Sequence, residues 1–205
     1  MKTFLRLAAA AFAVAAFAAV AVAAPAQWKT DKNHTEVAFE IRHFFSKVHG
    51  KFTDFDATIN FDDQDPTKIS VDGTVQAISI LTNNDRRDNH LRSEDFFYVE
   101  KFPTLTFKST KVTPDGKNKF KIAGDLTMRG VTKPVVFDAE YLGSADISMG
   151  GNATGAKAGF TATTVVNRQD YGIKWNKVLD SGGTMLDDNV TIILNIECDK
   201  VQAQK

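Results

Sequence analysis

The sequence predicts an all-β protein, an eight-stranded antiparallel barrel with one short helical insert between the third and fourth strands. Apolar and polar residues alternate with a period of two in eight segments, which is typical of strands with one buried face. Most connections between them are short and rich in turn-forming residues, which favours an antiparallel meander. Closing the sheet buries the apolar face and removes unpaired edges, although a two-sheet sandwich satisfies the same periodicity.

The first 23 residues have the three parts of a secretory signal peptide. Lys2 and Arg6 give a positive start, residues 7–20 form an uncharged apolar run, and Ala21-Val22-Ala23 fits a cleavage site. We expect cleavage after Ala23 or nearby, which leaves a single domain of residues 24–205. The apolar run is short for a membrane span and no second run follows it, so stable membrane insertion is not expected. In a Gram-negative cell the expected location is the periplasm.

The charge balance argues against nucleic acid as a partner. The chain has 25 basic and 25 acidic residues, and removing Lys2 and Arg6 leaves 23 against 25, a formal charge of −2. No basic excess remains that would attract a polyanion. The single cysteine, Cys198, cannot form an internal disulfide, and its place in an alternating apolar run predicts a buried, unreactive thiol.

The strands are expected where the alternation is clearest. These segments are residues 34–42, 51–61, 69–77, 104–108, 120–128, 135–142, 156–162 and 192–198. Phe52 is out of phase in the second segment, which predicts a bulge near Thr53 and Asp54. Arg129-Gly130 is a candidate two-residue hairpin turn. The remaining segments are expected to lack strands: residues 28–33 as a lead-in, 44–50 as a turn or short helix, 143–155 as a loop, and 167–188 as a long irregular excursion.

Residues 83–97 form the one dense charged segment with helical spacing. Asp88 and Arg92 stand four apart with the acid first, which favours a short helix, and Arg86 and His90 share the same spacing and therefore one face. We expect this helix to lie across one end of the barrel as a plug.

The charged side chains of the insert have two interpretations. In the first, ion pairs fix the plug to the barrel rim, and the pairing groups are Arg86, Arg87, His90 and Arg92 with Asp85, Asp88, Glu94 and Asp95. In the second, Arg86, His90 and Arg92 face a phosphate or another polar head group at the mouth of a pocket.

The inward-facing positions of the strands are rich in large apolar side chains. A barrel of about eight strands either fills its interior with side chains or holds one small ligand. Small residues among the large ones favour a ligand, namely Ala57, Gly73, Gly124, Ala139, Ala158 and Ala162, although the same positions are also compatible with a dry core. The candidate ligand-binding residues are Phe39, Ile41, Phe52, Ile59, Val71, Val75, Leu105, Phe107, Ile122, Leu126, Phe137, Phe160, Ile192 and Leu194.

Motifs for catalysis or metal binding are lacking in the sequence. It contains no G-x-S-x-G, no C-x-x-C and no glycine-rich phosphate loop. Its four histidines lack short ligand spacing, so neither a metal nor a cofactor is expected. We therefore expect a binding protein and not an enzyme. The alternatives are an enzyme for a hydrophobic substrate, with His90 and either Asp88 or Asp170 as acid and base, and a ligand-free barrel that binds other proteins; a homodimer is also possible.

Five blocks in the chain resemble the YceI-like family of exported, polyisoprenoid-binding, lipocalin-like proteins. The two most specific are Arg87-Asp88-x-His90-Leu91-Arg92-Ser93-x-Asp95-Phe96 and Gly124-Asp125-Leu126-Thr127-Met128-Arg129-Gly130-Val131-Thr132-Lys133-Pro134-Val135, and the others are residues 52–56, 101–109 and 167–172. The resemblance implies a lipocalin-like barrel with an elongated apolar lumen. It also implies a carrier or stress-response role for a polyisoprenoid or related amphiphile, such as a polyprenyl phosphate, an isoprenoid quinone or a fatty-acid derivative.

Overall fold

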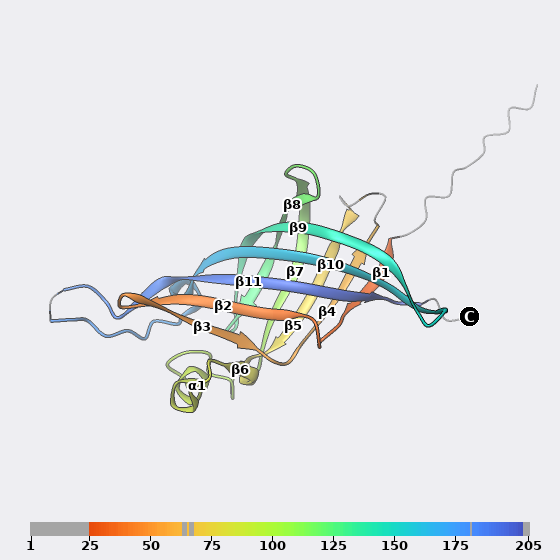
Figure 1. Ribbon diagram of the computed structural model, residues 1–205. Coiled ribbons are helices and arrows are strands. Elements are labelled where there is room, and N and C mark those ends of the chain that lie inside the picture. The colour runs from red at the N-terminus through yellow and green to blue at the C-terminus, as the bar shows by residue number, and fades with distance from the viewer. Residues whose placement is uncertain (1–24, 63–64, 66–67, 181, 203–205) are drawn as a thin grey trace, which may run out of the picture.

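Eight antiparallel strands form a closed ring in the order β1-β4-β5-β7-β8-β9-β10-β11, and the pairing of β1 with β11 closes it (Figure 1). The computed structural model describes residues 25–62, 65, 68–180 and 182–202, so the predicted signal peptide lies outside the described residues. The strands of the ring are β1 Ala26–Thr30, β4 Phe55–Phe61, β5 Ser70–Gln76, β7 Thr104–Pro114, β8 Lys119–Met128, β9 Val131–Met149, β10 Asn152–Asn167 and β11 Leu186–Lys200.

Three further strands continue strands of the barrel, so they do not raise the number of strands around it above eight. They are β2 (Glu36–His43), β3 (Ser46–Phe52) and β6 (Ile80–Leu81). β2 continues β1 along the same neighbour, β11, while β3 runs into β4 and β6 follows β5 after the short 3-10 helix η2 (Ala77–Ser79). The eight-stranded antiparallel barrel predicted from the periodicity is therefore confirmed, with three of its strands broken in two.

Local backbone chemistry explains where two predicted irregularities fall. The predicted bulge at Thr53 and Asp54 is the break between β3 and β4. Arg129 and Gly130 form the β8–β9 turn with φ values of 53° and 74°, so both central residues take the left-handed conformation that suits the twist of a tight hairpin.

Three sequence-based predictions of irregular structure are wrong. The expected lead-in, residues 28–33, begins inside β1, and most of the segment expected to be a turn or short helix is β3. Residues 143–155 are not a loop, because β9 and β10 pair from Asn152 opposite Met149 onward, with the turn at 150–151. Backbone pairing needs no alternation of side chains, so a glycine-rich ladder with register shifts gives no period-two signal.

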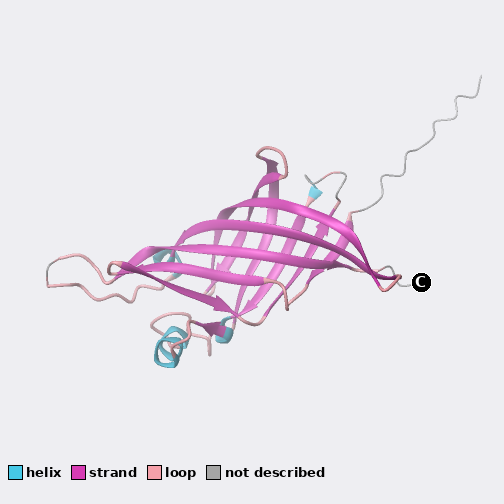
Figure 2. Cartoon of the chain, viewed as in Figure 1, coloured by secondary structure: helices cyan, strands magenta, loops and turns pink. Residues whose placement is uncertain are grey.

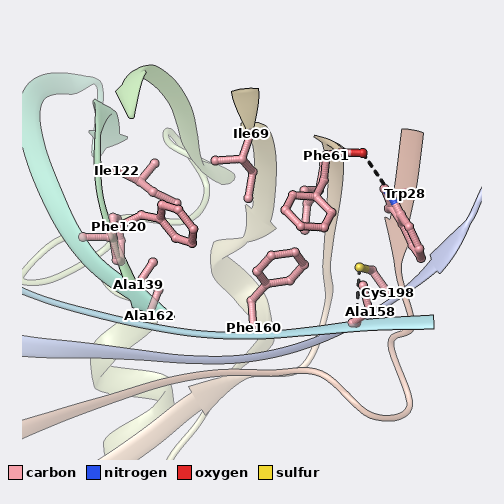
Figure 3. Close-up of a cluster of buried hydrophobic side chains, with 12 residues drawn as sticks. Trp28, Phe61, Ile69, Phe120, Ile122, Ala139, Ala158, Phe160, Ala162 and Cys198 are labelled. Atoms are coloured by element: carbon pink, nitrogen blue, oxygen red, sulfur yellow. Dashed lines mark hydrogen bonds between the residues drawn. The ribbon is translucent and has the colours of Figure 1, made fainter. Parts of the chain in front are cut away.

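One end of the barrel, which we call the packed end, is filled by interlocking side chains (Figure 3). Trp28 donates its indole N–H to the carbonyl oxygen of Phe61 at 3.4 Å, and the ring of Phe61 meets that of Phe160 edge-on at 5.2 Å. Cys198 is fully buried, its Sγ lies 3.4 Å from the carbonyl oxygen of Ala158, and burial raises the pKa of its thiol to about 12. This is the buried thiol expected from the alternation.

The opposite end, which we call the lumen end, is covered by the helical insert and by the excursion that precedes β11 (Figure 2). The insert contains α1 (Asp85–Arg92), and the excursion begins with the 3-10 helix η3 (Arg168–Tyr171). In the described part of the chain, no helix is long and apolar enough to cross a membrane.

Candidate functional site

Two adjoining cavities lie inside the barrel. The outer chamber, at the lumen end, has a volume of about 510 Å³, and the inner chamber, toward the packed end, has about 180 Å³. Five side chains border both chambers, so the two chambers adjoin inside the barrel, and we refer to them together as the lumen; the five are Phe39, Phe52, Leu105, Leu126 and Ile192. The outer chamber alone falls in the range of roughly 300–1,000 Å³ that small-molecule sites occupy.

All fourteen predicted lining residues border one chamber or both. Besides the five shared side chains, Ile41 borders the outer chamber. The other eight border the inner chamber and are Ile59, Val71, Val75, Phe107, Ile122, Phe137, Phe160 and Leu194. Their contact with a ligand stays a prediction.

The predicted gaps behave differently from one another. Ala57, Gly73, Ala139 and Ala162 border the inner chamber. Gly124 leaves no free space, because a Cβ built on it would lie 2.4 Å from the ring of Phe107. A small residue on the inner face therefore marks either empty volume or a neighbouring ring, and sequence cannot separate the two cases.

The helical insert is fixed to the barrel by a buried hydrogen-bond network. Asn84 caps the N-terminus of α1 by accepting from the backbone N–H of Arg87 at 3.0 Å. Asp88 is 2% exposed, and its carboxylate accepts from both the backbone N–H and the hydroxyl of Thr82. The guanidinium of Arg87 donates to the hydroxyl and carbonyl oxygens of the same threonine, at 2.7 and 2.9 Å. The network satisfies polar groups that would be costly to bury unpaired.

Arg92 anchors the insert, which corrects two expectations about this residue. Its guanidinium donates to the carbonyl oxygens of Ile78 and Ile80, both at 2.9 Å, and to Asn89 at 3.1 Å. The expected pair with Asp88 does not form, and Arg92 borders neither chamber, so it is not placed to meet a head group. Carbonyl groups at the end of a broken strand compete for the arginine, and sequence spacing cannot show them.

Arg86 and His90 do border the outer chamber. Arg86 is exposed and has no hydrogen-bond or ion-pair partner among the described residues, so the chamber reaches the surface at its side chain. His90 Nε2 lies 2.8 Å from Asp95, and its ring packs edge-on against Phe96 and Trp175, with centroids 5.0 and 4.9 Å away. Of the side-chain pairs expected within the insert, His90 with Asp95 is the one in contact among the described residues.

Arg168 holds the excursion over the outer chamber, and it was not among the site residues predicted from the sequence. It is 3% exposed and donates to the carbonyl oxygens of Ile173, Trp175 and Asp187 at 2.8–2.9 Å. It also pairs with Asp188 at 2.9 Å, while burial lowers its pKa. The available signal was the position of Arg168 in the family-like block 167–172. Other side chains of the outer chamber that were not predicted to line it include Val48, Leu91, Phe96, Phe97, Met128, Val166, Ile173, Trp175, Met185, Leu186 and Val190.

The acid–base arrangement needed by the enzyme alternative is not assembled. The carboxylate nearest to His90 is Asp95, while Asp88 is committed to Thr82 and Asp170 is exposed on η3. His90 therefore contacts neither of the two carboxylates, Asp88 and Asp170, that the enzyme alternative requires.

One group of side chains outside the lumen has the spacing of a metal site. Donor atoms of Asp31, His34 and Glu197 lie within 4.8 Å of one another. The ammonium group of Lys157 already contacts Asp31 at 2.8 Å and Glu197 at 2.9 Å, and it also contacts Asp199. These contacts hold the pKa of Asp31 well below its usual range. The lysine supplies the positive charge there and braces the turn between β1 and β2.

The closed eight-stranded barrel and its apolar lumen place the protein among the all-β barrels that enclose an internal cavity. Residues 28–198 match the family described as the YceI-like domain, so the chain belongs to the YceI-like family. It is 42% identical over 155 residues to Protein YceI of Escherichia coli O6:H1, covering 74% of this chain and 78% of that protein.

Solved structures share the architecture. The Campylobacter jejuni YceI protein has a TM-score of 0.66 and 34% identity, covering 84% of this chain and 96% of that one. A polyisoprenoid binding domain from Saccharophagus degradans, implicated in plant cell wall breakdown, has a TM-score of 0.62 over 85% of this chain and 98% of its own. At 10% identity, that second likeness shows the fold alone.

Proposed function

We propose that the protein is a periplasmic carrier that holds one long-chain amphiphilic lipid in its lumen. The observation that carries this proposal is the two-chamber lumen, which is lined mainly by apolar side chains in both chambers and bordered at the outer chamber by Arg86, Arg87, His90 and Arg168. The proposed lipid is a polyisoprenoid or a related compound, such as a polyprenyl phosphate, an isoprenoid quinone or a fatty-acid derivative. The apolar tail would lie along the lumen and the head near Arg86 and His90.

The energetics suit a long apolar tail better than a compact polar molecule. Burial gives roughly 0.8 kcal/mol per methylene, so about fifteen carbons give about 12 kcal/mol before the costs of association. Arg86 can donate to a phosphate or carbonyl oxygen without breaking another bond, since its guanidinium has no partner among the described residues. A carrier needs no acid–base pair, and neither Asp88 nor Asp170 contacts His90.

Two further observations support the proposal. The Saccharophagus degradans domain with the same fold is described as polyisoprenoid-binding. The predicted signal peptide of residues 1–23 supports export to the periplasm.

Native mass spectrometry of the protein purified from the periplasm, followed by organic extraction, tests the proposal. We expect an excess mass equal to one lipid per chain that extracts as a polyprenyl or acyl species. A clean apo mass, together with no uptake of added polyprenyl phosphate, quinone or fatty acid, would contradict the carrier proposal.

A matched pair of variants tests the location of the lipid. Ile192 borders both chambers, whereas Val165 is 60% exposed and lies on the outer surface of the neighbouring strand. Ile192→Glu should lower lipid retention at least about tenfold, because it places a charge against the tail. Val165→Glu should retain the lipid. Equal retention by both folded variants, judged by circular dichroism, would place the lipid elsewhere.

A further inference from the structure

The hairpin between β2 and β3 ends in two phenylalanines, Phe44 and Phe45. Phe44 has a φ of 51°, the left-handed conformation that asparagine and glycine adopt most easily at such turns. The side chain of Phe45 is fully exposed, at 104%. A turn made of Asn and Gly would form at lower cost, so folding alone does not explain two aromatic residues at this tip.

A second exposed apolar side chain projects beside this hairpin. Val178, in the excursion before β11, is 80% exposed. Its loop is joined to the hairpin because the backbone N–H of Phe44 donates to the carbonyl oxygen of Met185 at 2.9 Å. Figure 1 shows the β2–β3 turn and this loop extending from the same end of the barrel. We refer to Phe45 and Val178 together as the docking tip.

The docking tip adjoins the outer chamber. His43, immediately before the turn, borders that chamber, as do Trp175 and Met185 on the loop that carries Val178. The segments that bear the exposed apolar side chains therefore also form part of the chamber wall. A surface met by the docking tip would lie close to the chamber.

Unpaired cations lie on the loop that carries Val178. In the described part of the chain, Lys174 and Lys177 have no ion-pair partner, nor does Asp180 on the same loop. Arg86, Asp85 and Asp170 at this end of the barrel are also without one. On the hairpin itself, Arg42 is paired with Asp187, Lys47 with Glu40 and Lys51 with Glu36. Exposed apolar side chains flanked by free cations are the combination that binds the interface of a bilayer containing anionic lipid.

We propose that the docking tip binds the surface of a phospholipid bilayer that contains anionic lipid, with Phe45 inserted at the interface. The outer chamber then faces the membrane, from which an apolar ligand can enter without crossing water. This surface contact goes beyond the carrier function, and it is measurable on protein whether or not the lumen holds a lipid.

Vesicle co-sedimentation tests the proposal. The protein is purified after export, and intact mass confirms that the apolar residues 7–20 are absent, since they would bind vesicles themselves. We expect binding to vesicles of phosphatidylethanolamine and phosphatidylglycerol, weaker binding to phosphatidylcholine alone, and weakening by salt. Phe45→Ser should reduce binding at least about tenfold, and Lys177→Ser about fivefold.

Matched controls come from the opposite end of the barrel. Met149 is 70% exposed at the β9–β10 turn, and Lys111 is exposed on β7. Met149→Ser and Lys111→Ser should bind vesicles like the unchanged protein. Absence of vesicle binding by the unchanged protein, undiminished binding by Phe45→Ser, or an equal loss in Met149→Ser would each overturn the proposal.

A gain-of-signal variant gives an independent readout. Phe45→Trp should be quenched by vesicles with brominated acyl chains well beyond the quenching of the unchanged protein, in which Trp28 is buried and Trp175 packs against His90 and Phe96. Analytical ultracentrifugation tests the alternative that the docking tip binds a second copy of the chain and not a membrane. Self-association that Phe45→Ser abolishes, without vesicle binding, would replace the bilayer by a dimer interface. Lipid retention measured on the same variants is expected to be unchanged, so failure of docking and failure of the carrier function remain distinguishable.

Discussion

The two ends of the barrel are stabilised by different interactions. At the packed end the buried side chains are apolar and interlock around Phe61 and Phe160. At the lumen end the barrel is hollow, and the buried polar or charged residues in the described chain, Thr82, Asp88 and Arg168, all gather there.

This difference shows how the segments that cover a cavity are held in place. Apolar packing holds a segment by contact on all sides, and a cavity removes the contacts on one side. The insert and the excursion are therefore positioned by directional hydrogen bonds to backbone carbonyls. A network of this kind fixes geometry well, and a single side chain can release it.

The largest expected effect is at the packed end. Phe61 is 1% exposed and borders neither chamber. Phe61→Ala should lower the free energy of unfolding by about 3–5 kcal/mol, since the neighbouring rings cannot fill the hole. Chemical denaturation measures this loss. Lipid retention by the folded fraction should be unchanged, and a lost lipid without lost stability would show that the two ends are not separate.

At the lumen end, Arg168→Ala should lower the free energy of unfolding by about 3 kcal/mol or more, because buried carbonyl groups lose their donor. Arg168→Lys keeps a positive charge but cannot reach several carbonyl oxygens at once, so it should restore only part of the stability. Hydrogen exchange should show faster exchange confined to residues 168–188. Protection unchanged in this segment would show that Arg168 does not hold the excursion.

A smaller effect is expected from a side chain that borders the hollow. Phe97 lines the outer chamber, and its ring meets that of Phe52 edge-on at 5.6 Å. Phe97→Ala enlarges an existing cavity, so the free energy of unfolding should fall by only about 1–2 kcal/mol, while the lipid leaves faster. Denaturation compares the stability loss of Phe97→Ala with that of Phe61→Ala, and the rate of lipid transfer to vesicles compares how fast each variant releases the lipid. Equal stability losses would contradict a hollow lumen end.

The smallest effect has the opposite sign. The hydroxyl of Tyr171 is buried and has no hydrogen-bond partner among the described residues. Tyr171→Phe removes this group and should raise the free energy of unfolding by about 1 kcal/mol. A lower stability, measured by denaturation near pH 7, would indicate that the hydroxyl has a partner in solution.

The same tyrosine predicts a dependence on alkaline pH. Burial raises the pKa of Tyr171 to about 12, against 10.0 for the unfolded side chain. Between pH 10 and pH 12 the unfolded chain loses the proton and the folded chain keeps it, so stability falls as pH rises and is unaffected below pH 10. Tyr171→Phe should flatten this decline. Cys198 acts in the same direction from pH 9.0 upward, so Cys198→Ala is the matched test at the packed end.

Sequence alone predicted the wall and the inward face of the barrel. Alternation is local information, because neighbouring side chains on a strand point to opposite sides. It therefore placed all fourteen predicted residues on the lumen, and the Arg129-Gly130 turn followed from two residues. It missed β1 because a short strand gives too few alternations, although Trp28 is buried in it.

Only the tertiary structure decided which polar groups meet and how much of the interior stays empty. Arg92 and Arg168 bond to backbone carbonyls, which carry no sequence signature, and of the carboxylates proposed for His90 only Asp95 contacts it. Gly124 accommodates a ring, while Gly73 borders the inner chamber. Sequence determined the face on which each side chain lies, because that depends on adjacent residues. The volume left inside depends on how all eight strands close around it, and that is a property of the whole barrel.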